Sequence, residues 1–511
     1  MNPAVFSSLV ASAANSQAAC ALSAAGPEDY GSDRITKYYH YDDGRLSREQ
    51  RAVGTGLVQD YATYSYTLNG RIDWVDDAKG NRSKFAYDGF DRTLRLYFPK
   101  TTAGAHNYNS SDYEGYGYDE NGNRISLRLR SGETIGYQFD GLNRATKKTI
   151  PGSGGGDVVY GYTLQGQSTF ARFGSASGYG VQNGYDGFGR LTSSQSIAAI
   201  GTLQPLTYRY DEDGDRTRVT WPDGVYVDYT YDGRDHMNQV RENGVATGPG
   251  LLADYDEDAI SRRSYLNRGN GTTTDYHYDG ISRLSGLDQG LASTSRDLSL
   301  GFGYNPASQV IQRTVSNDAY SYYSLVQDRG YVADGLNRYS SVGGVTYGYD
   351  GRGNLLSDGS RSFSYDLENH LLSVTGSGVT AVNLTYDPMG RLLTSASGGT
   401  TTRYLYDGDK LVAEYNGSMI MRRYVHGAGV DEPLVWYEGT GLNDRRWLHT
   451  DHQGSVVATS DGAGAGTVYA YSAYGEPAYD NWGGSRFRYT GRSCCRRPSF
   501  TTIRRACMTR Y

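Results

Sequence analysis

The stretch Phe85-Ala86-Tyr87-Asp88-Gly89-Phe90-Asp91-Arg92 decides how this chain folds. Two aromatic residues separated by one position precede Asp88, and a short turn leads from there to Arg92. Side chains at positions i and i+2 of a strand project from the same face, so the two rings line one face. The Asp88 carboxylate is able to accept backbone N–H groups where the strand ends. This stretch therefore predicts a strand, a tight turn and a returning strand.

The same unit recurs along most of the chain, with Gly or Asn in the turn and an apolar residue after the Arg. Gly and Asn tolerate the positive φ that hairpin loops of three to five residues need, and the Arg can reach back to the Asp or stack on a ring. Further copies begin at Tyr41, Tyr116, Tyr137, Tyr185, Tyr208, Tyr229, Tyr276, Tyr347, Phe363, Leu384 and Tyr404. Stacked copies place their rings in cross-strand pairs. We predict an all-β fold of tandem hairpins; the only helical candidate, residues 9–24, has weak propensities.

The composition of the 511 residues favours one large repeat-built body over several ordinary domains. The chain holds 48 Tyr and 68 Gly but only 12 Pro and 12 Phe. A Tyr ring with its hydroxyl suits a half-buried strand position better than a dry helical core.

Charge and hydropathy exclude several classes of function. The formal net charge of -6 argues against a basic nucleic-acid-binding face. No stretch reaches the ~18 apolar residues that a membrane-spanning helix needs. The first residues lack the basic leader and sustained apolar run of a secretory signal. The four cysteines, Cys20, Cys494, Cys495 and Cys507, lie near the ends, so no disulfide framework is expected for the body.

The repeated unit resembles the YD repeats of Rhs and teneurin-like proteins, and the resemblance covers nearly all of residues 36–491. In that family the repeats form one long β-sheet that spirals into a hollow shell. The resemblance implies a container wall here, with polar and aromatic side chains facing both a lumen and solvent.

Residues 401–492 are similar to the first part of the Rhs-associated core domain. The similarity rests on stretches that follow one another in the family's order: Tyr404–Tyr415, Arg423–Gly427, Asp431–Leu434, Arg446–Val456, Tyr471–Pro477 and Arg486–Gly491. In the family, the end of this domain closes the shell, carries a self-cleavage site and precedes a variable toxin domain. We assign neither the protease nor a toxin activity to any residue of this chain.

After Gly491 the composition changes abruptly to the Cys- and Arg-rich tail that begins Cys494-Cys495-Arg496-Arg497. We interpret the tail as the product of a reading-frame shift near Ser493, because codons permitted for it encode the family's Tyr-rich continuation when they are read from one base earlier. The expected organisation is a flexible lead-in (1–35), a YD/RHS repeat shell (36–400), a partial Rhs-associated core domain (401–492) and an aberrant, frameshifted tail (493–511).

Two polar clusters are candidate sites, and we interpret both as structural. Asp211-Glu212-Asp213-Gly214-Asp215 resembles the start of a calcium loop but lacks the downstream bidentate Glu. His449, Asp451 and His452 could suggest a metal or hydrolytic cluster, although on a strand only the first two share a face. Gly152–Gly156 is a flexible link, because no Gly-Lys-Ser/Thr sequence follows it. We therefore expect no catalytic, cofactor-binding or metal-binding residue, and no enzyme.

The resemblance implies an encapsulation module, the shell wall of a bacterial Rhs-type polymorphic toxin or cell-surface protein. The intact parent would be secreted or cell-associated, and its C-terminal toxin cargo would be the partner. A surface carbohydrate-binding or adhesion array, in which exposed Tyr rings stack on sugars, and a non-functional fragment are the alternatives.

Overall fold

The computed structural model describes residues 35–152, 156–199, 201–306, 308–322, 330–429, 431–472, 475–478 and 486–491. These residues form antiparallel strands, and their helical segments are short 3₁₀ turns: η2 (Gly248–Gly250), η3 (Thr294–Arg296), η4 (Asp318–Tyr320) and η5 (Tyr489–Gly491). The predicted all-β class is confirmed. Residues 1–34 of the expected lead-in, with the helical candidate at 9–24, and the tail at 493–511 lie outside the described residues. No helix in the described ranges is long and apolar enough to span a membrane.

The chain divides into two compact units. The first comprises the described residues of Met1–Gly155, Gly303–Ile311 and Asp328–Ser362, and the second those of Gly156–Phe302, Gln312–Gln327 and Phe363–Tyr511. The chain passes from one unit to the other within β24 (Leu298–Tyr304), β25 (Val310–Val315) and β31 (Arg361–Tyr365).

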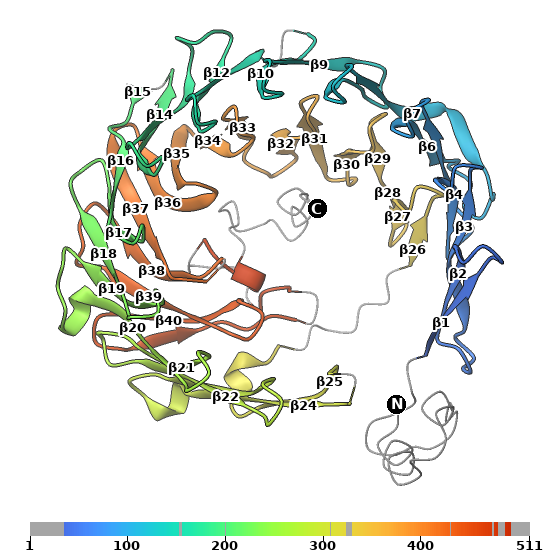
Figure 1. Ribbon diagram of the computed structural model, residues 1–511. Helices are drawn as coiled ribbons and strands as arrows, with labels where there is room; N and C mark the ends of the chain where they lie inside the picture. Colours follow the sequence, from blue (N-terminus) through green and yellow to red (C-terminus); the bar gives the residue numbers. More distant parts are fainter. Residues whose placement is uncertain are drawn as a thin grey trace. The chain divides into compact units, whose positions relative to one another are not determined.

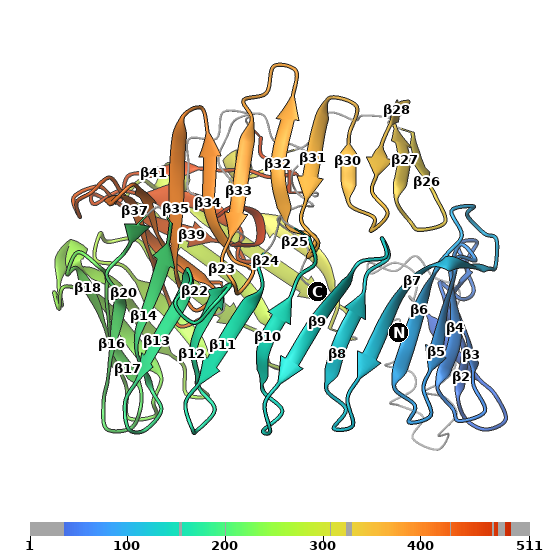
Figure 2. The ribbon, with the colours of Figure 1, turned by 90° about the horizontal axis from the view of Figure 1, so that it is seen from above.

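The first unit is built on an antiparallel meander in which each strand pairs with the next along the chain. Figure 2 shows its hairpins standing side by side. The meander consists of β1 (Thr36–His40), β2 (Leu46–Arg51), β3 (Gln59–Tyr66), β4 (Ile72–Asp77), β5 (Arg82–Tyr87), β6 (Thr93–Pro99), β7 (Tyr108–Tyr118), β8 (Arg124–Arg128), β9 (Thr134–Phe139) and β10 (Ala145–Thr149). Short strands from later in the chain complete the unit: β26 (Tyr331–Ala333), β27 (Tyr339–Val342), β28 (Val345–Thr346), β29 (Gly348–Tyr349) and β30 (Leu355–Ser357).

In this meander every turn from an odd to an even strand is a turn of the repeated unit, as between β5 and β6. Because successive turns of a meander alternate between the two ends of its strands, all repeat turns lie at the same end. The opposite end carries the turns that connect one repeat hairpin to the next, called return turns here, such as Asp77–Asn81 between β4 and β5.

The second unit has two layers of strands. The first layer contains β11 (Val158–Tyr162), β12 (Ser168–Phe173), β13 (Gly180–Tyr185), β14 (Leu191–Ala198), β15 (Gly201–Thr202), β16 (Leu206–Tyr210), β17 (Arg216–Thr220), β18 (Tyr226–Tyr231), β19 (Met237–Glu242), β20 (Leu251–Glu257), β21 (Arg263–Asn267), β22 (Thr273–Tyr278) and β23 (Leu284–Gly290). The second layer contains β32 (Leu371–Gly376), β33 (Val382–Tyr386), β34 (Leu392–Ser397), β35 (Thr400–Asp407), β36 (Lys410–Asn416), β37 (Met419–His426), β38 (Pro433–Glu438), β39 (Arg445–Thr450), β40 (Val456–Ser460) and β41 (Gly466–Val468).

The two layers pack face to face over an apolar core, and Figure 1 shows the orange strands β35 to β38 lying against the green strands β16 to β20. Leu206, Val227 and Val240 of the first layer meet Val412 and Val435 of the second. This part of the chain differs from the expected wall with polar and aromatic side chains on both faces, because the second layer covers the inner face of the first. The reason is sequence content: strands such as Pro433–Glu438 are almost wholly apolar and need burial on both faces.

The repeat hairpins contain a register shift next to the turn, and in many copies it falls at the Tyr that precedes the Asp. Ala86 pairs with Arg95, but Tyr87 pairs with Thr93, and the same shift occurs at Tyr118. The third residue after the Asp has positive φ, as expected for a three-residue hairpin loop whose last position is left-handed. Gly or Asn was predicted there, and Gly122 (φ 86) and Asn143 (φ 60) agree; Asp91 (φ 60), Ser261 (φ 61) and Ser282 (φ 68) occupy it at some strain.

Candidate functional site

The repeated turn is held by one carboxylate. The Oδ1 atom of Asp88 accepts the backbone N–H groups of Phe90 (2.9 Å) and Arg92 (3.0 Å), and Oδ2 accepts the Arg92 Nε–H (2.8 Å). The same three bonds recur in the turns of Asp140, Asp186, Asp258, Asp279, Asp334 and Asp387. The predicted capping of the turn by Asp, and the predicted return of Arg to Asp, are both confirmed.

These bonds favour the charged form of the carboxyl. At Asp140 the side-chain hydrogen bond from Arg144 lowers the pKa most, and the backbone N–H of Arg144 lowers it further. Where the repeat carries His in place of Arg, as at His370, the imidazole Nδ1 takes the guanidinium's position, 2.9 Å from the Asp366 carboxylate.

A second contact joins each hairpin to the preceding one. The Tyr118 hydroxyl donates to the carbonyl oxygen of Thr93 (2.9 Å), the residue that follows Arg92 in the preceding turn, while the Arg92 guanidinium lies 4.6 Å from the Tyr118 ring centroid. The hydroxyl contact recurs from Tyr66, Tyr87, Tyr210, Tyr231, Tyr278, Tyr386 and Tyr406. Stacking of Arg on a ring was predicted. The hydrogen bond from the Tyr hydroxyl to a carbonyl of the preceding hairpin, called the staple below, was not predicted. Nothing in the local sequence shows which carbonyl lies near a given Tyr hydroxyl.

In the first unit, repeat turns from later in the chain contact the end of the meander where its return turns lie. The Asn337 side-chain amide donates to Asp77 Oδ2 (2.7 Å), and the backbone N–H of Gly335 donates to the carbonyl of Thr101 (2.7 Å). A Cβ at Gly335 would lie 2.0 Å from the carbonyl oxygen of Lys100, so this contact needs Gly.

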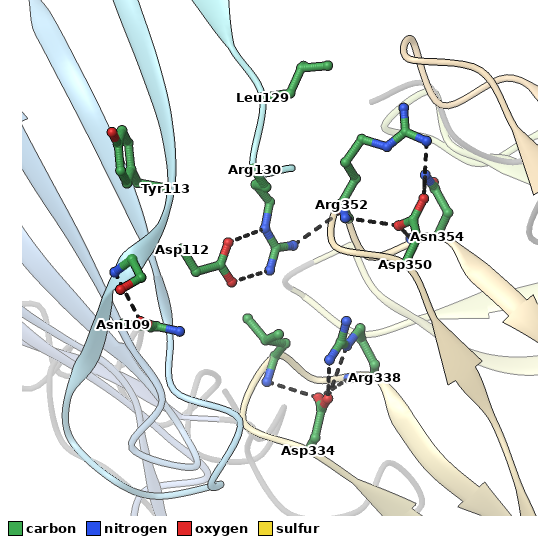
Figure 3. Close-up of polar contacts among 12 residues, drawn as sticks. Asn109, Asp112, Tyr113, Leu129, Arg130, Asp334, Arg338, Asp350, Arg352 and Asn354 are labelled. Atoms are coloured by element: carbon green, nitrogen blue, oxygen red, sulfur yellow. Dashed lines mark hydrogen bonds and ion pairs between the residues drawn. The ribbon is translucent and has the colours of Figure 1, made fainter. Parts of the chain in front are cut away.

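Figure 3 shows the neighbouring contact in the same unit. Asp112 holds the Arg130 guanidinium through two bonds, Nε at 2.8 Å and Nη2 at 2.5 Å. The remaining Nη1 donates to the backbone carbonyl of Arg352 (3.3 Å), in the turn that Asp350 and Asn354 organise. The bidentate ion pair therefore fixes the guanidinium so that its Nη1 donates to the turn that contains Arg352.

Cross-layer polar contacts in the second unit accompany the apolar core. The indole N–H groups of Trp221 and Trp447 donate to the backbone carbonyls of Val412 (3.1 Å) and Leu252 (3.0 Å), respectively. Glu242 accepts the Tyr437 hydroxyl (2.6 Å) and the Arg445 guanidinium. These contacts set the register of one layer on the other.

The structure does not bring His449, Asp451 and His452 together as a site. His449 is fully buried, with Nε2 2.8 Å from the Ser460 hydroxyl and Nδ1 3.2 Å from the side-chain oxygen of Gln289. Asp451 caps its turn by accepting the N–H of Gln453 and Ser455. The His452 ring packs on Phe302 with centroids 4.5 Å apart. Burial lowers the pKa of His449 well below its usual range, so its ring is neutral.

The calcium-like stretch is a repeat turn: Asp211 Oδ1 accepts the N–H groups of Gly214 (2.9 Å) and Asp215 (2.8 Å). Of the link at 152–156, residues 153–155 lie outside the described residues. Asp232, His236 and Glu257 place three potential metal ligands within 4.8 Å of one another. They lie at the surface, and His236 already pairs with Glu257 at 2.7 Å, so we assign them no ion.

Comparisons with known proteins agree with this picture. Residues 255–481 match the family model of the teneurin YD-shell. The crystal structure of TcdB2-TccC3-TEV aligns at a TM-score of 0.66 and 14% identity, over 90% of this chain and 29% of that chain. A Photorhabdus luminescens Tc holotoxin pore aligns at a TM-score of 0.66 and 13% identity, over 90% and 28% of the two chains. The tRNA3(Ser)-specific nuclease WapA of Bacillus spizizenii is 31% identical over 114 residues, which are 21% of this chain and 5% of that protein.

The capped turn, the staple between hairpins and the matching structures define a YD-shell fold. The chain matches the teneurin YD-shell family model over residues 255–481, under half of its length, as the resemblance of its repeats to Rhs and teneurin-like proteins indicated. It spans under a third of the length of the Tc toxin chains and a twentieth of the nuclease that it matches.

Proposed function

We infer that this chain forms part of the wall of an encapsulating shell in a secreted Rhs-type polymorphic toxin. The observation that carries this inference is the staple, in which the Tyr of one hairpin holds the backbone of the previous hairpin. Staples repeated along a meander make a continuous wall that does not depend on any single residue, as a container requires.

A scaffold role without catalysis fits the same contacts. Among the described residues, many repeat carboxylates cap turns, and His449 is buried with both ring nitrogens hydrogen-bonded. The function is therefore mechanical, and the partner is a cargo polypeptide of the intact parent.

The carbohydrate-binding array receives less support. A sugar stacks on a free aromatic face, but in the repeat that face carries a guanidinium, as Arg92 on Tyr118 (4.6 Å) and Arg190 on Tyr210 (5.1 Å) show. The hydroxyls of these rings are also occupied by backbone carbonyls.

Limited proteolysis of the intact parent tests the proposal, after sequencing of the coding DNA across Ser493 has defined the polypeptide that follows. We expect the cargo segment to resist protease inside the native protein. The triple variant Tyr87→Phe, Tyr118→Phe and Tyr386→Phe, which removes three staples, should make the cargo sensitive at lower urea concentrations, whereas Tyr38→Phe, an exposed Tyr, should not. A cargo segment cleaved as fast in the native parent as in isolation contradicts encapsulation.

A further inference from the structure

The sequence Asp-Gly-Leu-Asn-Arg occurs twice in the first unit, as the repeat turns 140–144 and 334–338. In both turns the Asp carboxylate accepts the backbone N–H groups of the Leu and the Arg. The later turn contacts the meander, as described above. The earlier turn does not: Leu142 is 67% exposed, and a Cβ at Gly141 would meet nothing within 4 Å. One sequence is therefore present once with a partner and once without.

The docked copy shows which groups recognise a return turn. The Asn337 amide donates to Asp77 Oδ2 (2.7 Å), and its side-chain oxygen accepts from Asn81 (3.3 Å). The backbone N–H of Gly335 donates to the carbonyl of Thr101 (2.7 Å), and Gly335 is buried. The partner thus presents a capping Asp carboxylate in one return turn and a free carbonyl in the next.

The following repeat turn contacts the following return turn. The carbonyl of Arg352 accepts Nη1 of Arg130, which lies in the return turn between β8 and β9 (3.3 Å). Figure 2 shows β26 to β30 along this end of the meander. Because neighbouring strands lie about 4.8 Å apart, successive hairpins have a common spacing of roughly 10 Å. A row of repeat turns therefore fits a row of return turns.

A second row of repeat turns lies at the other end of the meander. Leu68 and Phe90, at the tips of neighbouring turns, are even more exposed than Leu142. The Asn143 side-chain oxygen accepts from Asn123 (2.8 Å), and the described residues offer no acceptor for its amide N–H groups. Single exposed apolar residues are common on protein surfaces. Here, however, the docked copy of the same sequence shows what such a turn can bind.

Glycine at the second position is required by docking and not by the turn. A Cβ at Gly335 would lie 2.0 Å from the carbonyl oxygen of Lys100. The turn itself accepts a side chain there, because Ala259 occupies this position in the capped turn 258–262. Gly141 does not have positive φ. Gly141 therefore leaves open the space that a docked turn needs.

We propose that the repeat-turn end of the first-unit meander, centred on residues 140–144, docks on the return turns of a second hairpin wall. There the Gly141 N–H donates to a backbone carbonyl, the Asn143 amide donates to a capping Asp carboxylate, and Leu142 becomes half-buried, as Leu336 is. The return turns that carry this arrangement in the described chain already hold residues 334–338. The partner is accordingly a wall segment of the intact parent outside residues 1–511, and only this choice of source rests on the proposed function.

Sedimentation velocity of the full-length chain tests the docking. Gly335→Ala should displace residues 334–338 through the clash with Lys100 and leave two return turns vacant. The identical turn 140–144 of another molecule should then fill them, with a Kd on the order of 100 µM for so small an interface. We expect Gly335→Ala to self-associate as its concentration rises, and the natural chain to remain monomeric.

A second substitution identifies the turn that fills the vacancy. Gly141→Ala enters open space, so it should leave folding unchanged but weaken self-association of Gly335→Ala at least about tenfold. Gly441→Ala, at another open position, is the matched control and should not. The docking is overturned if Gly335→Ala stays monomeric, or if Gly141→Ala makes no difference. If circular dichroism shows that Gly335→Ala does not fold, Asn337→Asp, which faces Asp77 with a like charge, replaces it, and Asn143→Asp replaces Gly141→Ala.

Photo-cross-linking in the intact parent tests the source of the partner. A benzophenone amino acid at position 142 should form an adduct with a return turn outside residues 1–511, located by mass spectrometry. The same amino acid at position 94, within strand β6, should not form that adduct. No adduct, or an adduct within residues 1–511 or with the cargo, overturns the assignment. Protease resistance of the cargo remains a separate measurement, so encapsulation can fail while the docking holds, or the reverse.

Discussion

The phenol hydroxyl of Tyr87 donates a hydrogen bond to the backbone carbonyl of Ile72, 2.7 Å away and 15 residues earlier in the chain. Ile72 directly follows Arg71 of the preceding repeat turn, so the side chain of one hairpin holds the backbone of the hairpin before it. The same bond recurs from Tyr118, Tyr210 and Tyr386, so in these repeats one residue both ends its own strand and positions the neighbouring hairpin.

The first prediction concerns this staple. Tyr87→Phe removes the hydroxyl and leaves the ring, so it should lower the free energy of unfolding of the first unit by about 1 kcal/mol, the net value of a typical hydrogen bond. Urea denaturation followed by circular dichroism measures the change. Tyr38→Phe, at a position 56% exposed, is the matched control and should change stability by less than about 0.5 kcal/mol. Equal effects of the two substitutions would show that the staple contributes nothing.

The second prediction concerns Glu414, which is 1% exposed. It accepts the Arg486 guanidinium at 2.6 and 2.8 Å and the Tyr424 hydroxyl. Glu414→Gln leaves the Arg486 charge buried and unpaired, which should destabilise the second unit by roughly 3 to 5 kcal/mol.

Protease sensitivity of residues 486–491 and thermal unfolding measure this effect. Glu438→Gln is the control, because Glu438 pairs with Arg422 at a more exposed position and should cost at most about 1 kcal/mol. If Glu414→Gln destabilises the second unit as little as Glu438→Gln does, the Glu414–Arg486 pair does not anchor residues 486–491.

The third prediction concerns acid stability. Although burial opposes ionisation, the Arg486 charge and its hydrogen bond hold the pKa of Glu414 at about 2. This depressed carboxyl contributes stability above its unfolded pKa near 4.3, and that stability is lost as pH falls towards 2. His426 adds a loss of stability at a higher pH than Glu414 does. Its folded pKa is about 4, so as pH falls from about 6.5 to 4 the unfolded chain binds a proton at this residue and the folded chain does not, which favours unfolding.

Equilibrium unfolding at a series of pH values measures both slopes. Stability of the second unit should decline from pH 7 to 4, and His426→Gln should flatten that part of the curve by roughly 3 kcal/mol. The decline below pH 4 should persist in His426→Gln and weaken in Glu414→Gln. An unchanged slope between pH 7 and 4 in His426→Gln would contradict a buried neutral imidazole.

The fourth prediction concerns the left-handed turn position. Ser282 has φ 68 and Gly122 has φ 86 at the same place in their turns. Ser282→Gly should stabilise the chain by up to about 1 kcal/mol by relieving strain, and Gly122→Ala should destabilise it by about 1 kcal/mol. Thermal unfolding of the two variants should therefore shift in opposite directions. Shifts in the same direction would indicate that contacts of the side chain, and not φ, decide stability there.

Local features of the fold could be predicted from the sequence because their partners lie close together in it. Asp88 caps a turn that ends at Arg92, and both strands of the hairpin are readable from the spacing of their aromatic residues. His449 was interpreted as structural because the family motif accounts for it, and in the structure it is buried. The burial of His426 had no such signal, because a lone His in a strand does not reveal what packs against it.

The amino-acid sequence by itself determined the hairpin, its turn and the order of the repeats, since each depends on residues within about one strand length. The tertiary structure alone decided which carbonyl each Tyr meets and which strands are covered on both faces. The Trp447 indole reaches the carbonyl of Leu252, and the Tyr437 hydroxyl reaches Glu242, each across 195 residues of chain. Such contacts follow from the burial of apolar faces, which is non-directional and gives no sequence signal of its partner until the layers have packed.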